Sequence, residues 1–536
     1  MQKEIQLLIS HLKENGFIYP SSEIYGGLAN SFDYGPIGTL LKDNLKSLWK
    51  NYFVINNEKS FLFDSSIILN NKVWEASGHL NKFNDYMIER LNDNVRYNVE
   101  KLLKEYLKKN ISDLSLKEIE ELIKKEIKLP ESFIYDFLEK NKNTSNKEND
   151  KNKKIISKIN EFLPKYLNKR EESIIRLING IEENSNKIGK KYSSEEISQI
   201  FNISAEEIFQ IESEAMEKIK YKSETRWSEI KIFNLMFKII NSKTERNKEL
   251  YLRPETAQGI FINFKNLKDT LHLKLPFSIG QIGKSFRNEV TPGNFIFKTR
   301  EFEQLELESF ILPKTNTKEF NKTLKKVKLF LTKELKLNEE NLKYENVKKS
   351  DLAHYSKKTV DINYNFPFGF GEILGIADRG DFDLKNHEHF SKTNFHCTEE
   401  NKRIIPNIIE TSMGVERLLF AILIENYNKD KNKIYFPFSL APYKIAICPL
   451  TKNEEKDAKA IFNKIAKRDF GAIIFQTSGS IGKRYFRQDA IGTPFVITID
   501  KQYKDDKTFT IRHWDNKKQE RIKFGDLRKY IKQNAK

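Results

Sequence analysis

The spacing of apolar residues predicts two helices near the start of the chain. In the first, Ile5, Leu8, Ile9 and Leu12 recur at the three- and four-residue spacing of one helical face. A Gly-rich turn region, YPSSEIYGGLANSFDYGPIG, follows it. The second helix is predicted from the same kind of repeat, formed by Leu40, Leu41, Leu45, Leu48 and Trp49.

From about residue 100 to 222 the composition changes, and Lys, Glu, Asn and Ile dominate. The run KNKNTSNKENDKNKK, residues 140–154, has the low-complexity polar composition of a disordered linker. Helical patterns such as VEKLLKEYLKK lie on both sides of it. We therefore interpret residues 101–222 as a helical, lysine-rich insertion.

The remaining patterns predict a mixed core followed by a separate tail. Aromatic-rich strands alternate with Gly and Pro after residue 222, and a second lysine-rich segment, 313–360, begins with a helical pattern. Strands are expected at 361–376 and around 404–412, before a helix at 414–426. From about residue 437, strands and helices alternate, with helices at 453–468, 481–490 and 526–533. That alternation is typical of a small α/β domain.

Charge and cysteine content narrow the class of protein. The 93 Lys and Arg outnumber the 75 Asp and Glu, which gives a net charge of +18. Such an excess suits a polyanionic partner, although a surplus of surface lysine from composition bias explains it equally well. Cys397 and Cys448 are too few for a disulfide scaffold, and no apolar run reaches the ~18 residues of a membrane helix. We expect a cytoplasmic protein without a membrane span.

The segment 286–310 places cations, anions and phenylalanines close together. We expect two antiparallel strands, 279–289 and 297–309, joined at the turn VTPGN. Alternation would place Arg287 and Glu289 on one face of the first strand. On the second strand, one face would carry Arg300, Phe302, Gln304, Glu306 and Glu308. Buried unpaired charges cost several kcal/mol each, so this is either a solvated face of ion pairs or a functional site.

Two further segments carry similar polar residues. YLRPETAQGIF, residues 251–261, holds Glu255 two positions after Arg253. In IIETSMGVERLLFAIL, Glu410 and Ser412 end an apolar strand, and Arg417 follows Gly414 at a helix start. A strand–Gly–helix junction presents backbone N–H groups, and the guanidinium fork suits phosphate.

With these segments the chain resembles the class II aminoacyl-tRNA synthetases, and specifically the dimeric type of glycyl-tRNA synthetase. SFDYGPIGTLLKDNLKSLWK resembles the first class II motif, GKSFRNE with FKTREFEQLE the second, and GVERLLFAIL the third. GSIGKRYFRQDAIGTPFVITID resembles the anticodon-binding domain of the glycine, histidine, proline and threonine enzymes. The implied fold is α+β, an antiparallel-sheet catalytic core with a helical insertion and a C-terminal mixed α/β anticodon-binding domain. The domains expected are a core in two parts, 1–100 and 223–436, the insertion 101–222, a smaller insertion 313–360, and the anticodon-binding domain 437–536.

The resemblance also implies roles in ATP binding. Arg287 would neutralise the negative charge that builds up on the α-phosphate, and Arg417 would hold the far phosphates. Glu289 would accept a hydrogen bond from the amino group of adenine. Phe302 would lie flat on the adenine. With Arg287, Glu289 and Arg417 as catalytic residues, the expected ATP site comprises Arg287, Asn288, Glu289, Phe297, Arg300, Phe302, Glu372, Ile373, Gly414 and Arg417. Glu372 is a candidate Mg²⁺ ligand; a strand-end glutamate in water explains it equally well.

Glycine offers only an ammonium, a carboxylate and the absence of bulk for recognition. The residues that resemble the family's set are Glu255, Gln304, Glu306, Glu410 and Ser412, with Arg96 as the nearest candidate for a further substrate-contacting arginine. Contacts with tRNA(Gly) are expected from Lys483, Arg484 and Arg487. A homodimer is expected too, on the argument that the first motif's helix exposes Leu and Trp. No structural zinc is expected, because the paired CxxC motifs of many relatives are absent here.

Three other functions stay open at this point. The accessory subunit of mitochondrial DNA polymerase resembles the same scaffold without its catalytic arginines. A protein that only binds RNA is a second alternative, and a class II enzyme for another amino acid is a third. The presence here of Arg287, Glu289, Arg417, Glu255, Glu410 and Ser412 together favours an activating enzyme for glycine.

Overall fold

The computed structural model describes residues 2–91, 94–106, 114–127, 132–142, 150–183, 185, 187–239, 249–289, 293–349, 352–353, 356–399, 401–428 and 430–535. The chain forms two compact units, of which the first comprises Met1–Phe83 with Leu235–Lys536. The second is Asn84–Asn234, a continuous stretch inserted into the first. Its two ends meet at the first unit, because Leu235 N donates to Phe83 O at 3.1 Å.

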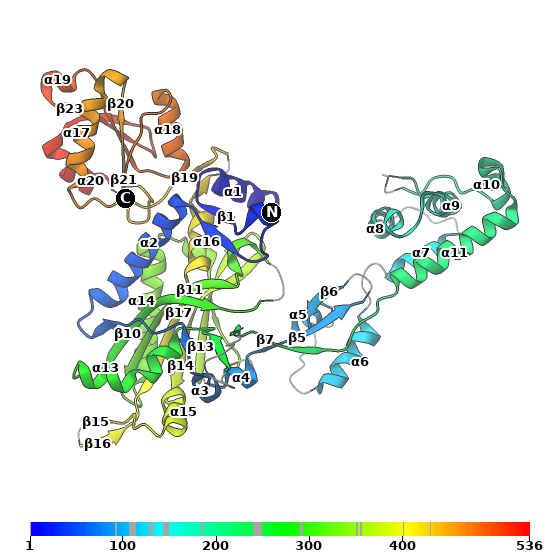
Figure 1. The fold of residues 1–536 in the computed structure, drawn as a ribbon, viewed down its shortest axis with the longest axis horizontal. Helices are drawn as coiled ribbons and strands as arrows, with labels where there is room; N and C mark the ends of the chain where they lie inside the picture. The colour runs from blue at the N-terminus through cyan, green and yellow to red at the C-terminus, as the bar shows by residue number, and fades with distance from the viewer. Residues whose placement is uncertain are drawn as a thin grey trace. The chain divides into compact units, whose positions relative to one another are not determined.

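A seven-stranded sheet is the centre of the first unit (Figure 1). The strand order is β12-β13-β14-β17-β11-β10-β3, and every pairing is antiparallel except the parallel pair β10 and β3. The expected antiparallel core is thus confirmed. In chain order the strands are β3 (Ser60–Leu62), β10 (Phe277–Phe286), β11 (Glu301–Ile311), β12 (Leu342–Asn346), β13 (Lys358–Phe366), β14 (Gly369–Gly380) and β17 (Asn407–Gly414). The strands expected at 361–376 are confirmed as β13 and β14, with a turn at Pro367 and Phe368 between them.

The N-terminal helices form as the apolar spacing predicts. Helix α1 (Gln2–Glu14) buries Leu8 and Leu12, and the short strands β1 (Ile18–Pro20) and β2 (Phe32–Tyr34) pair after it. Helix α2 (Pro36–Lys50) then begins with proline, whose missing N–H costs nothing at a helix start. Glycine is required at position 38, because a Cβ there would lie 2.0 Å from the carbonyl oxygen of Phe17.

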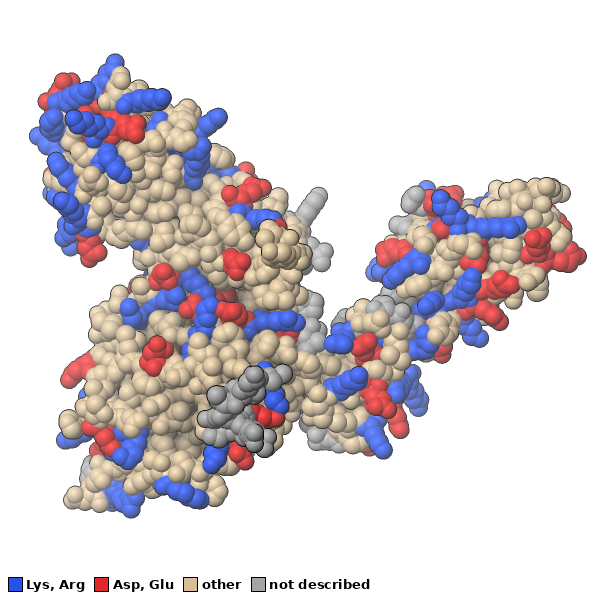
Figure 2. All heavy atoms as spheres, in the orientation of Figure 1, with Lys and Arg blue, Asp and Glu red and all other residues tan. Residues whose placement is uncertain are grey.

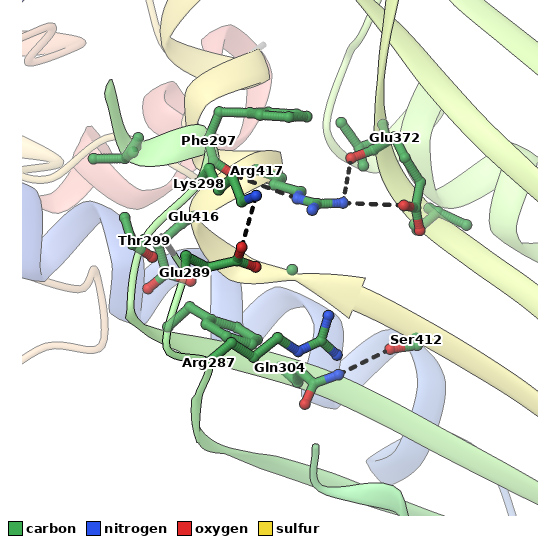
Figure 3. Close-up of a pocket in the computed structure, with 15 residues that line it drawn as sticks. Arg287, Glu289, Phe297, Lys298, Thr299, Gln304, Glu372, Ser412, Glu416 and Arg417 are labelled. Atoms are coloured by element: carbon green, nitrogen blue, oxygen red, sulfur yellow. Dashed lines mark hydrogen bonds and ion pairs between the residues drawn. The ribbon is translucent and has the colours of Figure 1, made fainter. Parts of the chain in front are cut away.

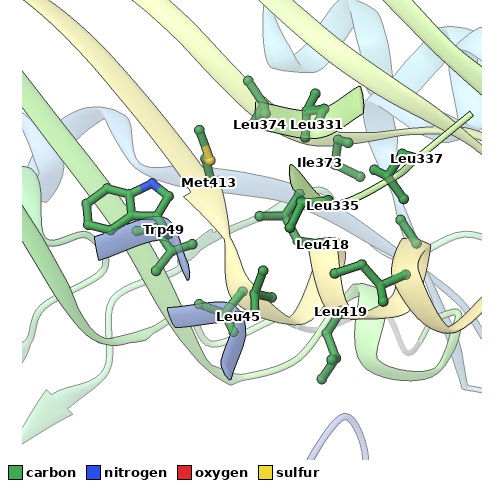
Figure 4. Close-up of a cluster of buried hydrophobic side chains, with 14 of the residues drawn as sticks. Leu45, Trp49, Leu331, Leu335, Leu337, Ile373, Leu374, Met413, Leu418 and Leu419 are labelled. Atoms are coloured by element: carbon green, nitrogen blue, oxygen red, sulfur yellow. The ribbon is translucent and has the colours of Figure 1, made fainter. Parts of the chain in front are cut away.

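One large hydrophobic core lies between the sheet, α2 and α16 (Val415–Asn426) (Figure 4). Leu41, Leu45 and Trp49 of α2 are fully buried in it. The expectation that this helix exposes Leu and Trp to a second copy is therefore wrong for these three side chains. An amphipathic pattern shows that a stripe is apolar, but it does not show that the chain's own sheet covers it.

Helix α14 (Asn316–Leu329) and the helical turn Phe330–Glu334 come from the lysine-rich segment 313–360. Phe320 and Val327 of this segment are buried in the same core, so it is part of the folded unit. A second hydrophobic cluster involves α12 (Ala257–Ile262), α13 (Phe264–Thr270) and α15 (Phe382–Ser391). The remaining elements are α3 (Asn71–Ala76), α4 (His79–Lys82), β4 (Ile68–Leu69), β8 (Lys238–Ile239), β9 (Leu250–Leu252), β15 (Cys397–Glu399), β16 (Lys402–Ile404), β18 (Tyr427–Asn428) and β19 (Lys433–Ile434).

The tail folds as a five-stranded sheet with helices, in the order β21-β20-β22-β23-β24. The predicted alternation is confirmed, with one further strand, β24. Lys and Arg are numerous on the face of this domain seen in Figure 2. Its elements are β20 (Ile445–Pro449), α17 (Glu455–Ala466), β21 (Ile473–Phe475), α18 (Ile481–Ala490), β22 (Phe495–Ile499), α19 (Tyr503–Asp506), β23 (Thr508–His513), β24 (Gln519–Lys523) and α20 (Leu527–Asn534).

The second unit combines a three-stranded sheet, β6-β5-β7, with helices α5 to α11. Because β5 and β7 pair with each other, the unit starts before and ends after the predicted insertion 101–222. Of the disordered linker predicted at 140–154, residues 143–149 lie outside the described residues. The prediction is wrong for the rest, because residues 140–142 end helix α7 and residues 150–154 begin helix α8. The elements are β5 (Asn84–Arg90), β6 (Val95–Asn98), β7 (Lys231–Asn234), α5 (Val99–Tyr106), α6 (Leu116–Glu126), α7 (Ser132–Lys142), α8 (Asp150–Tyr166), α9 (Lys169–Asn179), α10 (Ser194–Phe201) and α11 (Ala205–Ser223).

Among the described residues, no helix combines the length and the apolar character needed to cross a lipid bilayer.

Candidate active site

A hollow of about 120 Å³ opens beside the ends of β11, β14 and β17 and the start of α16 (Figure 3). It gathers most of the residues predicted to bind ATP, together with several that the sequence analysis missed. The residues that line it are Arg287, Glu289, Ile296, Phe297, Lys298, Thr299, Phe302, Gln304, Glu372, Ile373, Leu374, Ser412, Gly414, Glu416 and Arg417. Asn288 and Arg300, which were also expected in the ATP site, are not among them.

Strand register brings the polar segments together. In the antiparallel pair β11 and β17, Gln304 lies opposite Gly414, and Glu306 lies opposite Ser412. Glu308 lies opposite Glu410 in the same pair. The predicted common face of β11 is confirmed for Phe302, Gln304, Glu306 and Glu308, because alternate residues turn toward the site while Leu305 and Leu307 join the hydrophobic core. Arg300 was expected on this face too, but it precedes the strand, which begins at Glu301.

Arg287 points into the hollow from just beyond β10 (Figure 3). Strand β10 ends at Phe286, so the expectation that Arg287 and Glu289 share a strand face is wrong. The chain leaves the ladder at this point, where Arg287 N donates to Arg300 O at 2.9 Å. The guanidinium carbon lies 5.3 Å from the ring centroid of Phe302, and Nε donates to Pro254 O at 3.1 Å. Of the predicted turn VTPGN, residues 290–292 lie outside the described residues.

Arg417, at the start of α16, faces the opposite wall. Its Nη1 donates to the carbonyl oxygen of Glu372 at 2.9 Å and lies 3.2 Å from the Glu372 carboxylate. The guanidinium lies over the ring of Phe297, 4.8 Å from its centroid. Glu372 is thus held against an arginine, although 47% of its side chain is exposed.

Other contacts qualify the predicted roles in the hollow. Glu289, expected to meet the adenine amino group, pairs with Lys298 at 2.6 Å. Asn288 N donates to Leu235 O at 2.7 Å, and Arg300 Nε donates to Glu289 O at 3.4 Å. Asn288 and Arg300 therefore hold the backbone around the site, and their predicted contact with ATP remains a prediction.

The hollow continues into a buried polar network through Gln304 and Ser412. Gln304 Nε2 donates to Ser412 Oγ at 3.2 Å, and Gln304 Oε1 accepts from Thr256 N at 3.2 Å. Glu306 Oε2 accepts from Thr256 Oγ1 at 3.1 Å and from Ser412 Oγ at 3.3 Å. Four of the residues predicted to bind glycine, Gln304, Glu306, Glu410 and Ser412, therefore lie on two adjacent strands of one wall.

Glu255 joins the same network from the loop before α12. Its carboxylate lies 3.3 Å from His79 Nε2 and accepts from Gln258 Nε2 at 3.0 Å. Burial alone would raise the pKa of Glu255, but the charges of His79 and Arg379 outweigh it and hold the pKa well below the usual range. Glu255 is consequently an anion at neutral pH.

Glu410 pairs with Arg379, a buried residue that the sequence analysis did not single out. Arg379 Nη1 donates to Glu410 at 2.8 Å, while Nε and Nη2 hold Asp383 at 2.7 and 2.8 Å. Arg379 lies near the end of β14, in the segment ILGIADRG, whereas Asp383 lies at the start of α15, so no spacing rule within a single element pointed to this pair.

Comparison with known proteins identifies the family. Residues 237–427 match the family described as tRNA synthetase class II core domain (G, H, P, S and T), and residues 444–534 match the anticodon binding domain. A glycine–tRNA ligase of Mycoplasmopsis synoviae (strain 53) is 39% identical over 99% of this chain and 100% of its own. One of Mycoplasma capricolum subsp. capricolum is 41% identical over 99% of both chains. The chain belongs to the glycine–tRNA ligase family.

A solved structure agrees with this assignment at the level of the fold. A prolyl-tRNA synthetase from Cryptosporidium parvum superimposes with a TM-score of 0.56 at 10% identity, over 98% of this chain and 74% of that one. The chain therefore has the fold of a class II synthetase.

A third match lies in the second unit, where residues 165–221 match the family described as Sigma-70, region 4. They include α10 and α11, which are separated by a tight turn with Asn202 in the left-handed conformation. A groove-reading helix–turn–helix places the start of its second helix against nucleic acid. Here that start carries the exposed acids Glu206 and Glu207, and acidic side chains are visible at this end of the unit in Figure 2. The negative charge opposes such binding.

Two groups of predicted residues lie outside the hollow in this member of the glycine–tRNA ligase family. Arg96 belongs to the second unit, where its exposed side chain donates to Glu89 at 3.0 Å; its contact with substrate remains a prediction. On α18, Lys483 and Arg487 are exposed. Arg484 is buried and donates to the carbonyl oxygens of Gly479, at 3.1 Å, and Pro449. Its burial supports a structural role in place of the predicted RNA contact.

Proposed function

We propose that the protein is a glycine–tRNA ligase, which uses ATP to convert glycine to glycyl-adenylate and transfers the glycyl group to the 3′ end of tRNA(Gly). Pyrophosphate leaves in the first step and AMP in the second. The observation that carries the proposal is one continuous site in which two guanidinium groups line a hollow and buried carboxylates lie directly behind it. Full-length similarity to glycine–tRNA ligases supports the same reaction.

The hollow suits a nucleoside triphosphate. Arg287 and Arg417 reach it from different elements, so each can neutralise a different phosphate of ATP. Such fixed cations stabilise the negative charge that develops as the glycine carboxylate attacks the α-phosphorus. Phe302, which already carries Arg287 against its ring, offers the flat apolar surface expected for adenine.

Glu372 is the residue that would hold Mg²⁺ in this proposal. Its carboxylate is about half exposed beside Arg417 and provides the oxygen ligand that this ion prefers. Bound there, Mg²⁺ would supply further positive charge toward the phosphates.

The buried network suits a small ammonium ion. Glu255, Glu306, Glu410 and Ser412 offer oxygen acceptors, and all three carboxylates are buried or nearly so. A site enclosed in this way excludes larger amino acids by steric overlap. Arg96 stays the candidate for an additional substrate contact.

Binding of tRNA(Gly) is proposed for the C-terminal domain, with Lys483 and Arg487 as exposed contacts.

A homodimer is also proposed. Because Leu41, Leu45 and Trp49 of α2 are buried, the exposed apolar residues that support a dimer lie elsewhere. Ile24 and Tyr25 are 87% and 86% exposed, which is unusual for large apolar side chains. The expectations of a cytoplasmic protein without structural zinc are kept; both cysteines are free and buried.

Glycine-dependent exchange of labelled pyrophosphate into ATP tests this proposal with the purified full chain. Glycine should stimulate the exchange, whereas alanine and serine should not, because only glycine fits the enclosed carboxylates. Stimulation by alanine or serine in preference to glycine would assign another substrate. The absence of exchange with all three would favour a non-catalytic or purely RNA-binding protein.

A further inference from the structure

Glu308 is a buried carboxyl group that the assigned roles leave unexplained. It lies on β11 opposite Glu410 of β17, is 0% exposed, and faces the glycine end of the site. Among the described residues, neither of its carboxylate oxygens has a hydrogen-bond partner, and the same is true of Glu306 Oε1. Carboxylate oxygens of Glu306, Glu308 and Glu410 all lie within 4.8 Å of one another.

The charged groups around Glu308 do not balance. Asp383 and Glu410 share the guanidinium of Arg379, and Glu255 is paired with His79. Within the part of the chain that the structure describes, no ion pair compensates Glu306 or Glu308. Two adjacent, uncompensated carboxylates in a dry interior would each cost several kcal/mol. The empty site therefore retains at least one proton.

Hydrogen bonding distinguishes which of the three carboxyl groups holds the proton. Burial raises the pKa of all three carboxyl groups, but Glu306 accepts hydrogen bonds from two hydroxyl groups and Glu410 accepts one from a guanidinium, and these partners favour the charged form. Glu308 has neither kind of partner among the described residues. Burial, and then the charges of Glu410 and Glu306, raise the pKa of Glu308 well above its usual value, while Arg379 opposes and Asp383 adds to this shift.

We propose that Glu308 holds a proton in the empty site and releases it when the ammonium group of glycine enters. The O–H bond of Glu308 breaks, its electron pair remains on the carboxylate, and the proton passes to solvent. One cation replaces another, so the net charge of the cluster is unchanged. Glu308 is then a positioning residue that acts through Glu306 and Glu410, and the inference rests on glycine being the substrate.

The proposal fixes the sign of a pH effect. Because binding releases a proton, glycine affinity must rise with pH over the range in which the glycine-free cluster is protonated and the glycine-bound cluster is not, by up to about tenfold per pH unit. Glu308→Gln has nearly the same shape and is permanently neutral. The variant and the wild type should therefore bind glycine alike at low pH, and the wild type should bind more tightly as the pH rises.

The test combines calorimetry with kinetics on the full chain. Glycine is titrated in buffers of different ionisation enthalpy to count the protons released, and the KM for glycine in pyrophosphate exchange is measured from about pH 6 to about pH 8.5. We expect the wild type to release close to one proton for each glycine bound, and Glu308→Gln to release close to none. The KM values of the two proteins, plotted against pH, should converge at low pH. Glu301→Gln, an exposed change on the same strand, should follow the wild type.

Several results would overturn the proposal. A KM shifted by the same factor at every pH would assign Glu308 a purely structural role. Equal proton release by both proteins would place the proton elsewhere, and a tightly bound metal ion lost in the variant would make the cluster a cation site. If Glu308→Gln does not fold, the wild-type proton count alone decides, and no release refutes the inference. Failure of the proposed function is distinct, because wild type would then show no glycine-dependent exchange at any pH.

Discussion

The ammonium nitrogen of Lys42 lies 2.7 Å from the carboxylate of Glu416, although 374 positions separate the two residues. The same nitrogen lies 2.7 Å from the carboxylate of Glu303. All three side chains are largely buried, with 11%, 5% and 14% exposure for Lys42, Glu416 and Glu303. Burial lowers the pKa of Lys42, but the two carboxylates outweigh it and raise the pKa overall. One lysine thus joins the three segments that resemble the class II motifs.

Lys42→Met should strongly destabilise the protein, because it removes the cation paired with the buried carboxylate of Glu416 and leaves Glu303 with only Lys46, at 3.3 Å. Removing one partner of a buried pair costs about 3–5 kcal/mol in free energy of unfolding. Urea denaturation measures the change. Lys13→Met is the matched control, since Lys13 and its partner Glu23 are half exposed and such pairs contribute about 0–1 kcal/mol. Equal small losses in both variants would show that the buried pairs contribute little.

Arg287→Ala should strongly slow adenylate formation and leave tRNA binding intact. Loss of one preorganised cation typically lowers the rate by about 10²- to 10³-fold, which pyrophosphate exchange can measure. Arg287→Lys should recover little, because an ammonium cannot present the guanidinium fork. Arg403→Ala, at an exposed position on β16, serves as the control. Simultaneous loss of exchange and of tRNA binding would instead identify a structural arginine.

Lys483→Ala and Arg487→Ala should weaken tRNA binding without affecting exchange. Each lost phosphate contact should reduce the slope of log affinity against log salt by about 1. Filter binding at several salt concentrations gives that slope. Lys467→Ala, also exposed in the C-terminal domain, should leave it unchanged. A parallel fall in tRNA-independent exchange would mean that α18 supports the catalytic core.

Asp361→Asn should stabilise the protein at neutral pH. Burial, followed by the charges of Glu372 and Glu345, raises the pKa of Asp361 to about 6. An acid with a raised folded-state pKa loses stability as pH rises from about 4 to 6. The shift corresponds to about 3 kcal/mol before solvent screening, so we expect about 1–2 kcal/mol for this partly exposed side chain.

Thermal or urea unfolding at about pH 4 and about pH 7.5 checks this expectation, with a gain only at the higher value. Asp505→Asn, an exposed change of the same kind, provides the control. A gain that is equal at both pH values would show that the amide acts through packing and not through charge.

Local periodicity predicted much of the site, because the residues concerned are neighbours in the sequence. The common face of Gln304, Glu306 and Glu308 follows from alternation along one strand, and the start of α16 beside Gly414 follows from a strand–Gly–helix pattern. These features depend on the order of residues within a single element. No information about distant contacts was needed for them.

Long-range partners were not predictable in this way. Arg379, His79 and Lys42 each meet a carboxylate far away in the chain, and no spacing rule connects them. The same limit explains the error at α2, where an apolar stripe was assigned to a second copy although the chain's own sheet covers Trp49. Arg484 looked like an RNA contact because its sequence neighbours are basic, and only the fold reveals its burial.

The hydrogen bond between Leu235 and Phe83 has a consequence for how this chain can change over time. The chain leaves the first unit after Phe83 and returns to it at Leu235, and neither residue lies in a strand of the main sheet. A module inserted in this way can be lengthened, trimmed or exchanged in evolution as freely as a surface loop, while the chemistry beside it stays under separate selection.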